Sequence, residues 1–147
     1  MRRIELHARA RGRPAAEVYE ILCALERYPS CSTAVRSLTI LERSSDRIVS
    51  RWEVDFHGGV LRWTEEDRLL PEKFVIQFRQ IEGDADYYAG EWGVRDEDDG
   101  CSLWFSAEFD LGMPSLDLTL GPIAEMAFRE NARLIVVGLL GDSTEIA

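Results

Sequence analysis

The chain has 147 residues, 46% of them hydrophobic and 10% aromatic, and its 17 basic and 27 acidic side chains give a net charge of −10. This composition is typical of a globular protein, and the length predicts one domain with a single core, residues 1–147. So acidic a chain repels phosphate backbones, which argues against a nucleic-acid partner. No apolar run of about 20 residues is present to span a membrane, and no secretory signal is recognisable.

The cysteines, histidines and glycines exclude several classes of site. Cys23, Cys31 and Cys101 form no C-x-x-C motif, and we expect reduced thiols in the cytoplasm. His7 and His57 lack metal-ligand spacing, so no metal site is predicted. The sequence has no P-loop, G-x-G-x-x-G or G-x-S-x-G motif, which argues against nucleotide cofactors and serine-hydrolase chemistry. We therefore expect no cofactor.

Hydrophobic periodicity predicts the N-terminal elements in chain order. Residues 3–10 alternate apolar and polar side chains, as in a half-buried strand. Pro14 is expected to open a helix and Pro29 to end it. The apolar stripe of this helix consists of Val18, Ile21, Leu22 and Leu25.

Strand signals then run from Ala34 to Leu111, and turn signals divide them into about six antiparallel strands. A second helical pattern covers residues 123–140, after Gly121-Pro122 and before Gly141. Because a sheet with one buried face needs a cover, we expect the sheet to curl around this helix. The predicted fold is α+β: a curved antiparallel sheet of about seven strands, a long C-terminal helix, and one or two short N-terminal helices.

The predicted sheet-facing side of the long helix has little side-chain volume. A helical wheel places the amide of Asn131 among the small residues Ala124, Ala127 and Gly138. This pattern predicts a cavity beside the helix, with Asn131 pointing into it. The alternative is close packing of helix on sheet, with Asn131 hydrogen-bonded to a strand side chain.

Aromatic side chains share the inward face of the predicted strands, since they recur with period two. The inward aromatic set comprises Trp52, Trp63, Phe78, Tyr88, Trp92 and Phe105. Glu65 and Asp67 are in phase with Trp63, and Gln80 is in phase with Phe78. Such a surface suits a flat, oxygenated, mostly apolar ligand. Alternatively, Glu65 and Asp67 emerge at a strand end and Gln80 caps a hairpin.

Six short motifs occur in an order and spacing that cover nearly the whole chain. They are Pro14–Tyr19, Leu25–Pro29, Trp63–Glu65, Gly90–Trp92, Phe109–Pro114 and Arg129–Leu134. In these the chain resembles the START-like, Bet v 1-like helix-grip superfamily, and more closely its polyketide cyclase/aromatase branch, which includes coenzyme-Q-binding START proteins. Two departures stand out. Tyr28 replaces the usual Trp, and the nearest match to a cavity arginine, Arg68, faces inward only if its strand carries a bulge.

The resemblance implies a cofactor-free cyclase or aromatase that acts on a poly-β-ketone, delivered by an acyl carrier protein. The reaction is an intramolecular aldol condensation followed by loss of water. Glu65 is then a general base or acid with a pKa raised by burial. Asn131, Gln80 and Arg68 hold carbonyl oxygens. The inward aromatic set and Ala127 line the ligand.

Two alternatives to catalysis remain open at the sequence level. One is a carrier of a quinone, lipid or polyketide, in which the same polar groups only orient the ligand. The other is a protein-interaction module of the toxin-like START group, which would act through its sheet surface.

Overall fold

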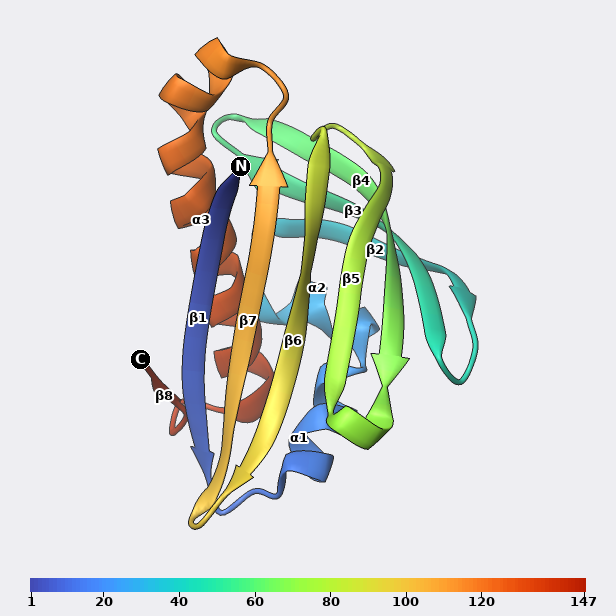
Figure 1. Cartoon of the computed structure of the whole chain (residues 1–147), viewed down its shortest axis with the longest axis vertical. Helices are drawn as coiled ribbons and strands as arrows, with labels where there is room; N and C mark the ends of the chain where they lie inside the picture. Colours follow the sequence, from blue (N-terminus) through green and yellow to red (C-terminus); the bar gives the residue numbers. More distant parts are fainter.

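The computed structural model describes residues 1–147 as an eight-stranded antiparallel sheet curved around one long helix (Figure 1). The strands are β1 (Arg2–Arg11), β2 (Val35–Arg43), β3 (Arg47–Phe56), β4 (Gly59–Leu70), β5 (Val75–Gly83), β6 (Tyr87–Glu97), β7 (Gly100–Asp110) and β8 (Glu145–Ile146). Their order in the sheet is β2-β3-β4-β5-β6-β7-β1-β8. The predicted fold class is confirmed, and the strand beyond the expected seven is β8, whose two residues are too few to show a periodic pattern.

Two short helices follow β1, namely α1 (Ala15–Leu22) and α2 (Tyr28–Cys31), with a 3₁₀ turn at Leu25–Arg27 between them. A second 3₁₀ turn, Pro71–Lys73, links β4 to β5. The prediction that Pro29 ends the first helix is wrong, because Pro29 lies in the first turn of α2. Proline is tolerated there since the first-turn N–H has no partner within the helix.

The long helix α3 spans Pro114–Leu140, so it begins at residue 114 rather than at the predicted 123. Pro122 lies inside it and removes one helical hydrogen bond. Arg2 of β1 holds this stretch together, because its guanidinium donates to Asp117 Oδ1 at 2.8 Å and to Glu125 Oε1 at 2.9 Å, one on each side of the proline. None of the helices is both long and apolar enough to cross a membrane.

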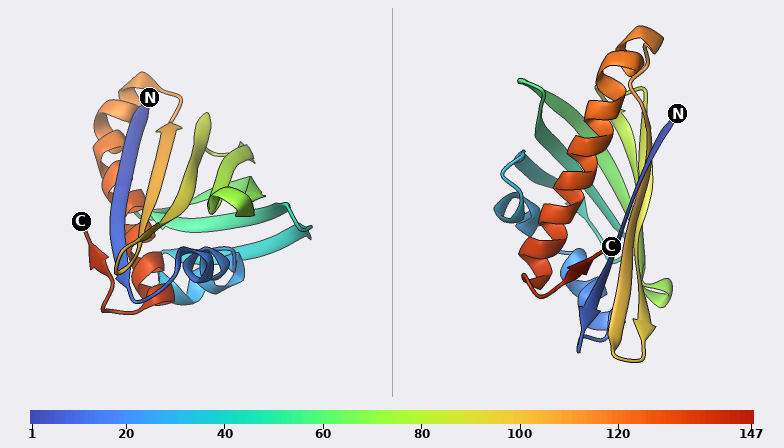
Figure 2. Two further views of the ribbon diagram at one scale, coloured as in Figure 1. Left: turned by 60° about the horizontal axis from the view of Figure 1, so that its bottom comes forward. Right: turned by 90° about the vertical axis from the view of Figure 1, so that its left-hand side faces the viewer.

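The helix lies lengthwise along the concave face of the sheet, with α1 and α2 at one end of it (Figure 2). Its buried face keeps the predicted Ala124 but is rotated toward Phe128, Ala132, Ile135 and Leu139. Gly138, predicted to face the sheet, instead contacts α2: a Cβ atom there would lie 2.5 Å from Cys31 Cβ. The helix is rotated because it packs against α2 as well as the sheet, a contact that the wheel alone cannot include.

Candidate active site

Strand β4 places two carboxyl groups on the concave face of the sheet. Its alternation turns Trp63, Glu65 and Asp67 inward, where they are 7%, 4% and 2% exposed. Both carboxyls lie well inside β4, and Glu65 and Asp67 pair with Ser50 and Ile48 of β3. The strand-end alternative for these residues is therefore wrong.

Glu65 and Asp67 form a buried, hydrogen-bonded pair of carboxyl groups. Trp63 Nε1 donates a hydrogen bond to Glu65 Oε1 at 3.0 Å, whereas Asp67 Oδ1 is buried without any partner. Burial raises the pKa of Glu65, and the hydrogen bonds from Asp67 and Trp63 partly offset that rise. Burial raises the pKa of Asp67 well above its usual range, and the adjacent Glu65 adds to it. The arrangement favours one proton for the pair, held by Asp67 and donated to a Glu65 carboxylate.

Aromatic rings enclose this pair on several sides. Trp52 stacks on Trp63 with ring centroids 5.4 Å apart, and Tyr88 meets Trp63 edge-on at 5.5 Å. Tyr88 also stacks on Phe128 of α3 at 5.3 Å. The wall is completed by contacts among Phe78, Trp92 and Phe105. The structure thus brings together all six members of the inward aromatic set predicted from the sequence.

Tyr28 of α2 belongs to the same wall. Its hydroxyl donates to the carbonyl oxygen of Leu22 at 2.6 Å, which fixes the ring beside Trp52 and Trp92. Burial raises the pKa of Tyr28 well above its usual range, as it does that of Tyr88. Both phenols are therefore neutral hydrogen-bonding groups near the carboxyl pair at physiological pH.

Asn131 reaches the interior from α3 but is only half-buried. Its Oδ1 accepts a hydrogen bond of 2.5 Å from the hydroxyl of Ser32, in the link between α2 and β2. The close-packing alternative predicted a strand side chain as the hydrogen-bond partner of Asn131, and this is wrong, because Ser32 lies outside the strands. Because the oxygen is engaged, the amide NH₂ is the part of Asn131 that can donate to a ligand.

The enclosed space beside the carboxyl pair is small. A void of about 30 Å³, room for one water molecule, is bordered by Glu65, Asp67, Asn131 and the surrounding rings. Two further voids adjoin it, one of about 10 Å³ and one of about 160 Å³, and Phe128 borders all three. The small residues of α3 do not leave a large cavity, because sheet rings fill the space. Ala124 is fully buried in this packing, whereas Ala127 lines the 160 Å³ void.

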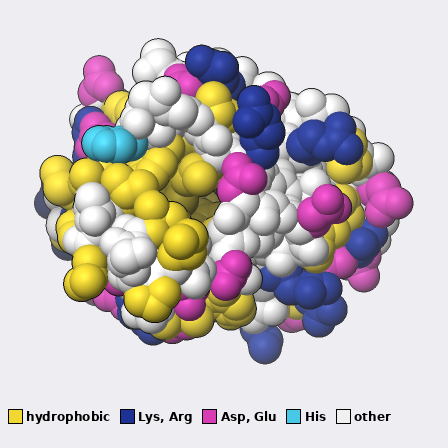
Figure 3. Space-filling view, turned by 90° about the horizontal axis from the view of Figure 1, so that it is seen from above, with side chains coloured by type: hydrophobic (Ala, Val, Ile, Leu, Met, Phe, Trp, Pro, Cys, Tyr) yellow, Lys and Arg dark blue, Asp and Glu magenta, His cyan; other side chains and the backbone are white.

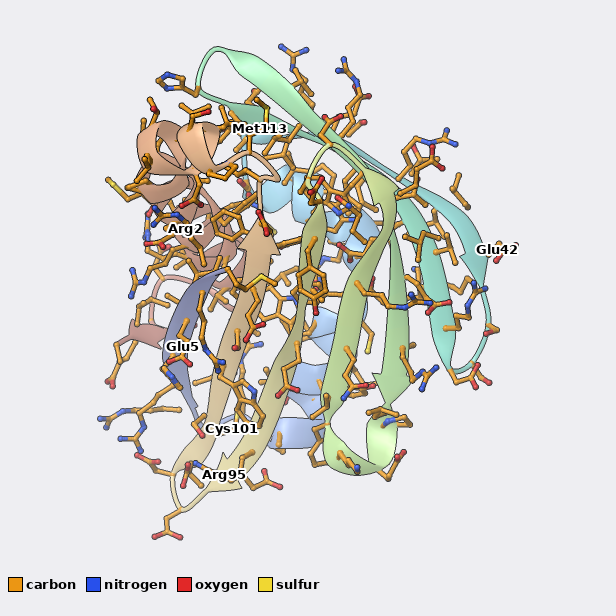
Figure 4. All side chains as sticks on the ribbon, turned by 45° about the horizontal axis from the view of Figure 1, so that its top comes forward. Arg2, Glu5, Glu42, Arg95, Cys101 and Met113 are labelled. Atoms are coloured by element: carbon orange, nitrogen blue, oxygen red, sulfur yellow. The ribbon has the colours of Figure 1, made fainter.

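The 160 Å³ void lies between α3 and the β3–β4 hairpin, and Ala34, Phe56, Leu61 and Leu134 help to line it. Viewed from the end where α3 begins, hydrophobic side chains gather on one side around a hollow (Figure 3). Met113, which precedes α3, lies at this end of the molecule (Figure 4) and is 60% exposed. Leu118, Ile123 and Met126 of α3 are also exposed. We call this end the mouth.

Two residues predicted from the sequence lie away from the carboxyl pair. Gln80 Nε2 donates to the carbonyl oxygen of Ala85 at 2.7 Å, so it caps the β5–β6 turn and borders only the 10 Å³ void. Arg68 is exposed on the outer face of the sheet. The pairing of β4 with β5 has one irregularity. Thr64 pairs with Glu82 and Glu65 pairs with Gln80, so β5 has one extra residue, Ile81, that has no partner in β4. Strand β4 therefore keeps its alternation, and no bulge turns Arg68 inward.

A hollow of about 680 Å³ lies on that outer face and is not the site that we propose. It is an open groove whose lining is mostly polar, and several of its charged side chains form ion pairs, such as Arg3 with Glu108 and Arg79 with Glu66. Neither the carboxyl pair nor the tryptophans of the interior reach it. No group of three or more His, Cys, Asp or Glu side chains in the molecule is placed to hold a metal ion.

Three residues of the interior were not among the site residues predicted from the sequence: Asp67, Tyr28 and Phe128. Asp67 is in phase with Glu65, which was a sufficient signal for an inward position. Tyr28 was visible only as a departure from a family motif, and Phe128 lay at the margin of the predicted helix face. Their positions depend on how α2 and α3 pack against the sheet.

Comparisons with known proteins agree with this fold. Residues 12–134 match the sequence profile of a family described as polyketide cyclase / dehydrase and lipid transport. A solved structure from Thermus thermophilus, TTHA0849, is 27% identical with a TM-score of 0.84, covering 94% of each chain. The Zhui aromatase/cyclase from a Streptomyces species is 24% identical with a TM-score of 0.79, over 95% of this chain and 91% of that one.

A START superfamily protein from Mycobacterium smegmatis is 17% identical with a TM-score of 0.66, over 94% of this chain and 92% of that one. No curated protein sequence matches the chain. The profile match and these neighbours confirm the family resemblance predicted from the sequence motifs.

Proposed function

Because the chain belongs to the polyketide cyclase/dehydrase and lipid transport family, we propose that it closes and dehydrates a ring in a poly-β-ketone without a cofactor. The observation that carries this proposal is a carboxylate, Glu65, held inside an aromatic interior. Burial raises the pKa of Glu65, which brings its basicity closer to that of a useful general base at neutral pH. The Zhui protein, described as an aromatase/cyclase, shares the fold.

In the proposed reaction, Glu65 removes a proton from a methylene group between two ketones. The resulting enolate carbon attacks a second carbonyl of the same chain, so that a C–C bond forms as the C=O π bond opens, and the new alkoxide takes the proton from Glu65 to become a hydroxyl. The NH₂ group of Asn131 donates to the oxygen on which negative charge develops. The aromatic walls hold the flexible chain in the conformation that brings the two carbons together, which lowers the entropic part of the barrier.

Binding of such a substrate requires the interior to open. A void of about 30 Å³ is far below the roughly 300 Å³ of a typical small-molecule pocket. We propose that the substrate enters at the mouth, passes along the 160 Å³ void between α3 and the β3–β4 hairpin, and displaces Phe128. Delivery by an acyl carrier protein in the cytoplasm, where the three free cysteines stay reduced, completes the proposal.

The test is conversion of an acyl-carrier-bound poly-β-ketone in single turnover, with binding followed by tryptophan quenching of the same variants. Glu65→Gln should leave affinity nearly unchanged and lower the rate by about 10²-fold or more. Asn131→Leu should weaken both binding and turnover. Glu66→Gln, one residue along β4 on the outer face, is the matched control. An unchanged rate and product profile with Glu65→Gln would remove Glu65 from the mechanism.

A carrier function is the second candidate, and one observation favours it. Gln80 is engaged with the backbone and Arg68 lies outside, so fewer polar groups face the ligand than the sequence predicted. For a carrier, Glu65→Gln should change affinity alone, by about 1 kcal/mol, as for a single hydrogen bond. The wild-type protein would then leave the poly-β-ketone unconverted.

A further inference from the structure

Asp67 has no task in the reaction described so far, although it is more deeply buried than Glu65. It makes no ion pair with any basic side chain, since the neighbouring Arg47 pairs with Glu42 and Glu66 on the outer side of the sheet. Its Oδ1 atom has no hydrogen-bond partner. A buried carboxyl group in this situation destabilises the fold, so packing does not explain its presence.

The position of Asp67 leaves one of its oxygens available to a ligand. The side chain borders the interior void together with Glu65 and Asn131. One side of the carboxyl group bonds to Glu65, and the free Oδ1 can interact with a hydroxyl group brought by the substrate. Aldol cyclisation generates just such a group, a hydroxyl on the carbon β to a ketone.

We propose that Asp67 is a second catalytic residue, which binds the β-hydroxyl of the cyclised intermediate and protonates it as it leaves. This inference rests on the proposed cyclase function and assigns its dehydration half-reaction to the Glu65–Asp67 pair. Glu65 is then the base and Asp67 the acid of one unit that carries a single proton.

The step balances within the pair. The Glu65 carboxylate takes the proton from the carbon between the ketone and the hydroxyl-bearing carbon. The C–H electrons form the new C=C bond, the C–O bond breaks, and the oxygen leaves with the Asp67 proton as water. The pair still holds one proton afterwards, now on Glu65, and its transfer through the direct hydrogen bond to Asp67 restores the starting state.

The test uses a substrate that needs only the dehydration step and no carrier protein. We choose the α-tetralone that bears a hydroxyl on the carbon β to its carbonyl, because loss of water and tautomerisation give fluorescent α-naphthol. Binding is measured separately by tryptophan quenching with α-naphthol. Asp67→Asn should lower the dehydration rate by about 10²-fold or more and change α-naphthol affinity by less than tenfold.

A double-mutant comparison separates a catalytic pair from a structural one. If the two carboxyls act as a unit, Glu65→Gln with Asp67→Asn should be little slower than either single variant. If they act independently, the two losses should multiply. Glu66→Gln on the outer face serves again as the control, and thermal melting shows whether each variant is folded.

The pH profile of the dehydration rate also tests whether the two carboxyls act as one unit. A one-proton pair gives a rate that rises and then falls with pH, and each single variant should lose one limb. The other titratable groups near the pair are Cys23 of the α1 end, Tyr28 of α2, Tyr88 of β6 and Glu66, the next residue of β4, whose pKa is lowered by its hydrogen bond with Arg47. Burial raises the pKa of Cys23 to about 11 and those of the two tyrosines well above their usual range, so none titrates near neutrality.

The outcomes separate this inference from the proposed function. Asp67→Asn with a wild-type rate, or a wild-type profile with a single limb, would overturn the role of Asp67. The cyclase proposal would survive that result if Glu65→Gln still abolished ring closure of the poly-β-ketone. A wild-type protein that binds α-naphthol but dehydrates the tetralone no faster than the double variant would overturn this inference, and failure on the poly-β-ketone as well would overturn both.

Discussion

Burial of the two carboxyl groups among aromatic rings lowers the stability of the folded chain, and the same loss of hydration raises their affinity for protons, which suits them to acid–base catalysis. Water is replaced by rings around Glu65 and Asp67, and only Trp63 Nε1 donates a hydrogen bond to the pair from outside it. The charged form of either group is therefore disfavoured, so protons stay bound at a pH where exposed carboxyls have lost them. Stability and proton affinity are coupled at these two residues.

This coupling predicts how stability depends on pH. Because the folded pKa of Asp67 lies above its unfolded value, the folded chain binds more protons than the unfolded chain between those two values. The free energy of unfolding should therefore fall as pH rises through that window. Asp67→Asn, whose amide can still donate to Glu65, should raise stability by about 1–3 kcal/mol near pH 8 and by less toward pH 4. Denaturant melts at several pH values measure this, and a gain independent of pH would contradict it.

How far these residues were predictable from the sequence depends on how local their determinants are. Alternation along one strand correctly turned Trp63 and Glu65 inward, because period two is a property of the strand itself. Alternation also placed Asp67 on the inward face. It does not show where a strand ends, however, so the sequence alone left open a strand end near Asp67, whereas β4 continues to Leu70. The extra residue Ile81 in β5 exists only relative to its partner β4, so the position of Gln80 could not follow from its own strand.

At the scale of elements, α3 shows how contacts from other parts of the chain decide where a helix begins and which face it buries. Gly121 and Pro122 favour a break, and the helical pattern begins only after them. The helix continues past Pro122 because Arg2, at the other end of the sequence, contacts residues on both sides of the proline. Gly121 leaves room for the Arg2 guanidinium. Likewise, Gly138 lets α2 approach α3, which rotates the buried face away from the predicted one.

The contact between α2 and α3 predicts an unusual response to a helix-favouring substitution. Ala in place of a mid-helix Gly normally stabilises a helix by up to about 1 kcal/mol. At position 138 the new Cβ would lie 2.5 Å from Cys31 Cβ and 2.9 Å from Cys31 Cα, so α2 must shift. Gly138→Ala should therefore lower the free energy of unfolding by about 1–3 kcal/mol, measured by denaturant melting.

Thr119→Ala, at an exposed position of the same helix, is the control and should be neutral or slightly stabilising. A stabilised Gly138→Ala protein would show that α2 does not press on α3 in solution.

Across the whole molecule, the sheet and α3 surround an interior that is nearly filled by aromatic rings. The three voids meet at Phe128, which stacks on Tyr88 and meets Phe109 edge-on with ring centroids 5.2 Å apart. On the proposed route from the mouth to the carboxyl pair, a ligand would displace this ring. The free energy of displacing it is subtracted from the affinity of every ligand.

Removal of the Phe128 ring tests this whole-molecule argument. Phe128→Ala joins the voids into one cavity and should lower the free energy of unfolding by about 3–5 kcal/mol, as large-to-small core substitutions do. The variant no longer has a ring to displace, so its affinity for α-naphthol should rise roughly tenfold, equivalent to about 1.4 kcal/mol. Leu103→Ala makes a similar deletion at a residue of β7 that is 1% exposed and borders none of the three voids. It should lose stability without any gain in affinity. Equal α-naphthol affinity in the wild type and Phe128→Ala, measured by tryptophan quenching below both melting temperatures, would mean that ligands reach the carboxyl pair without passing Phe128.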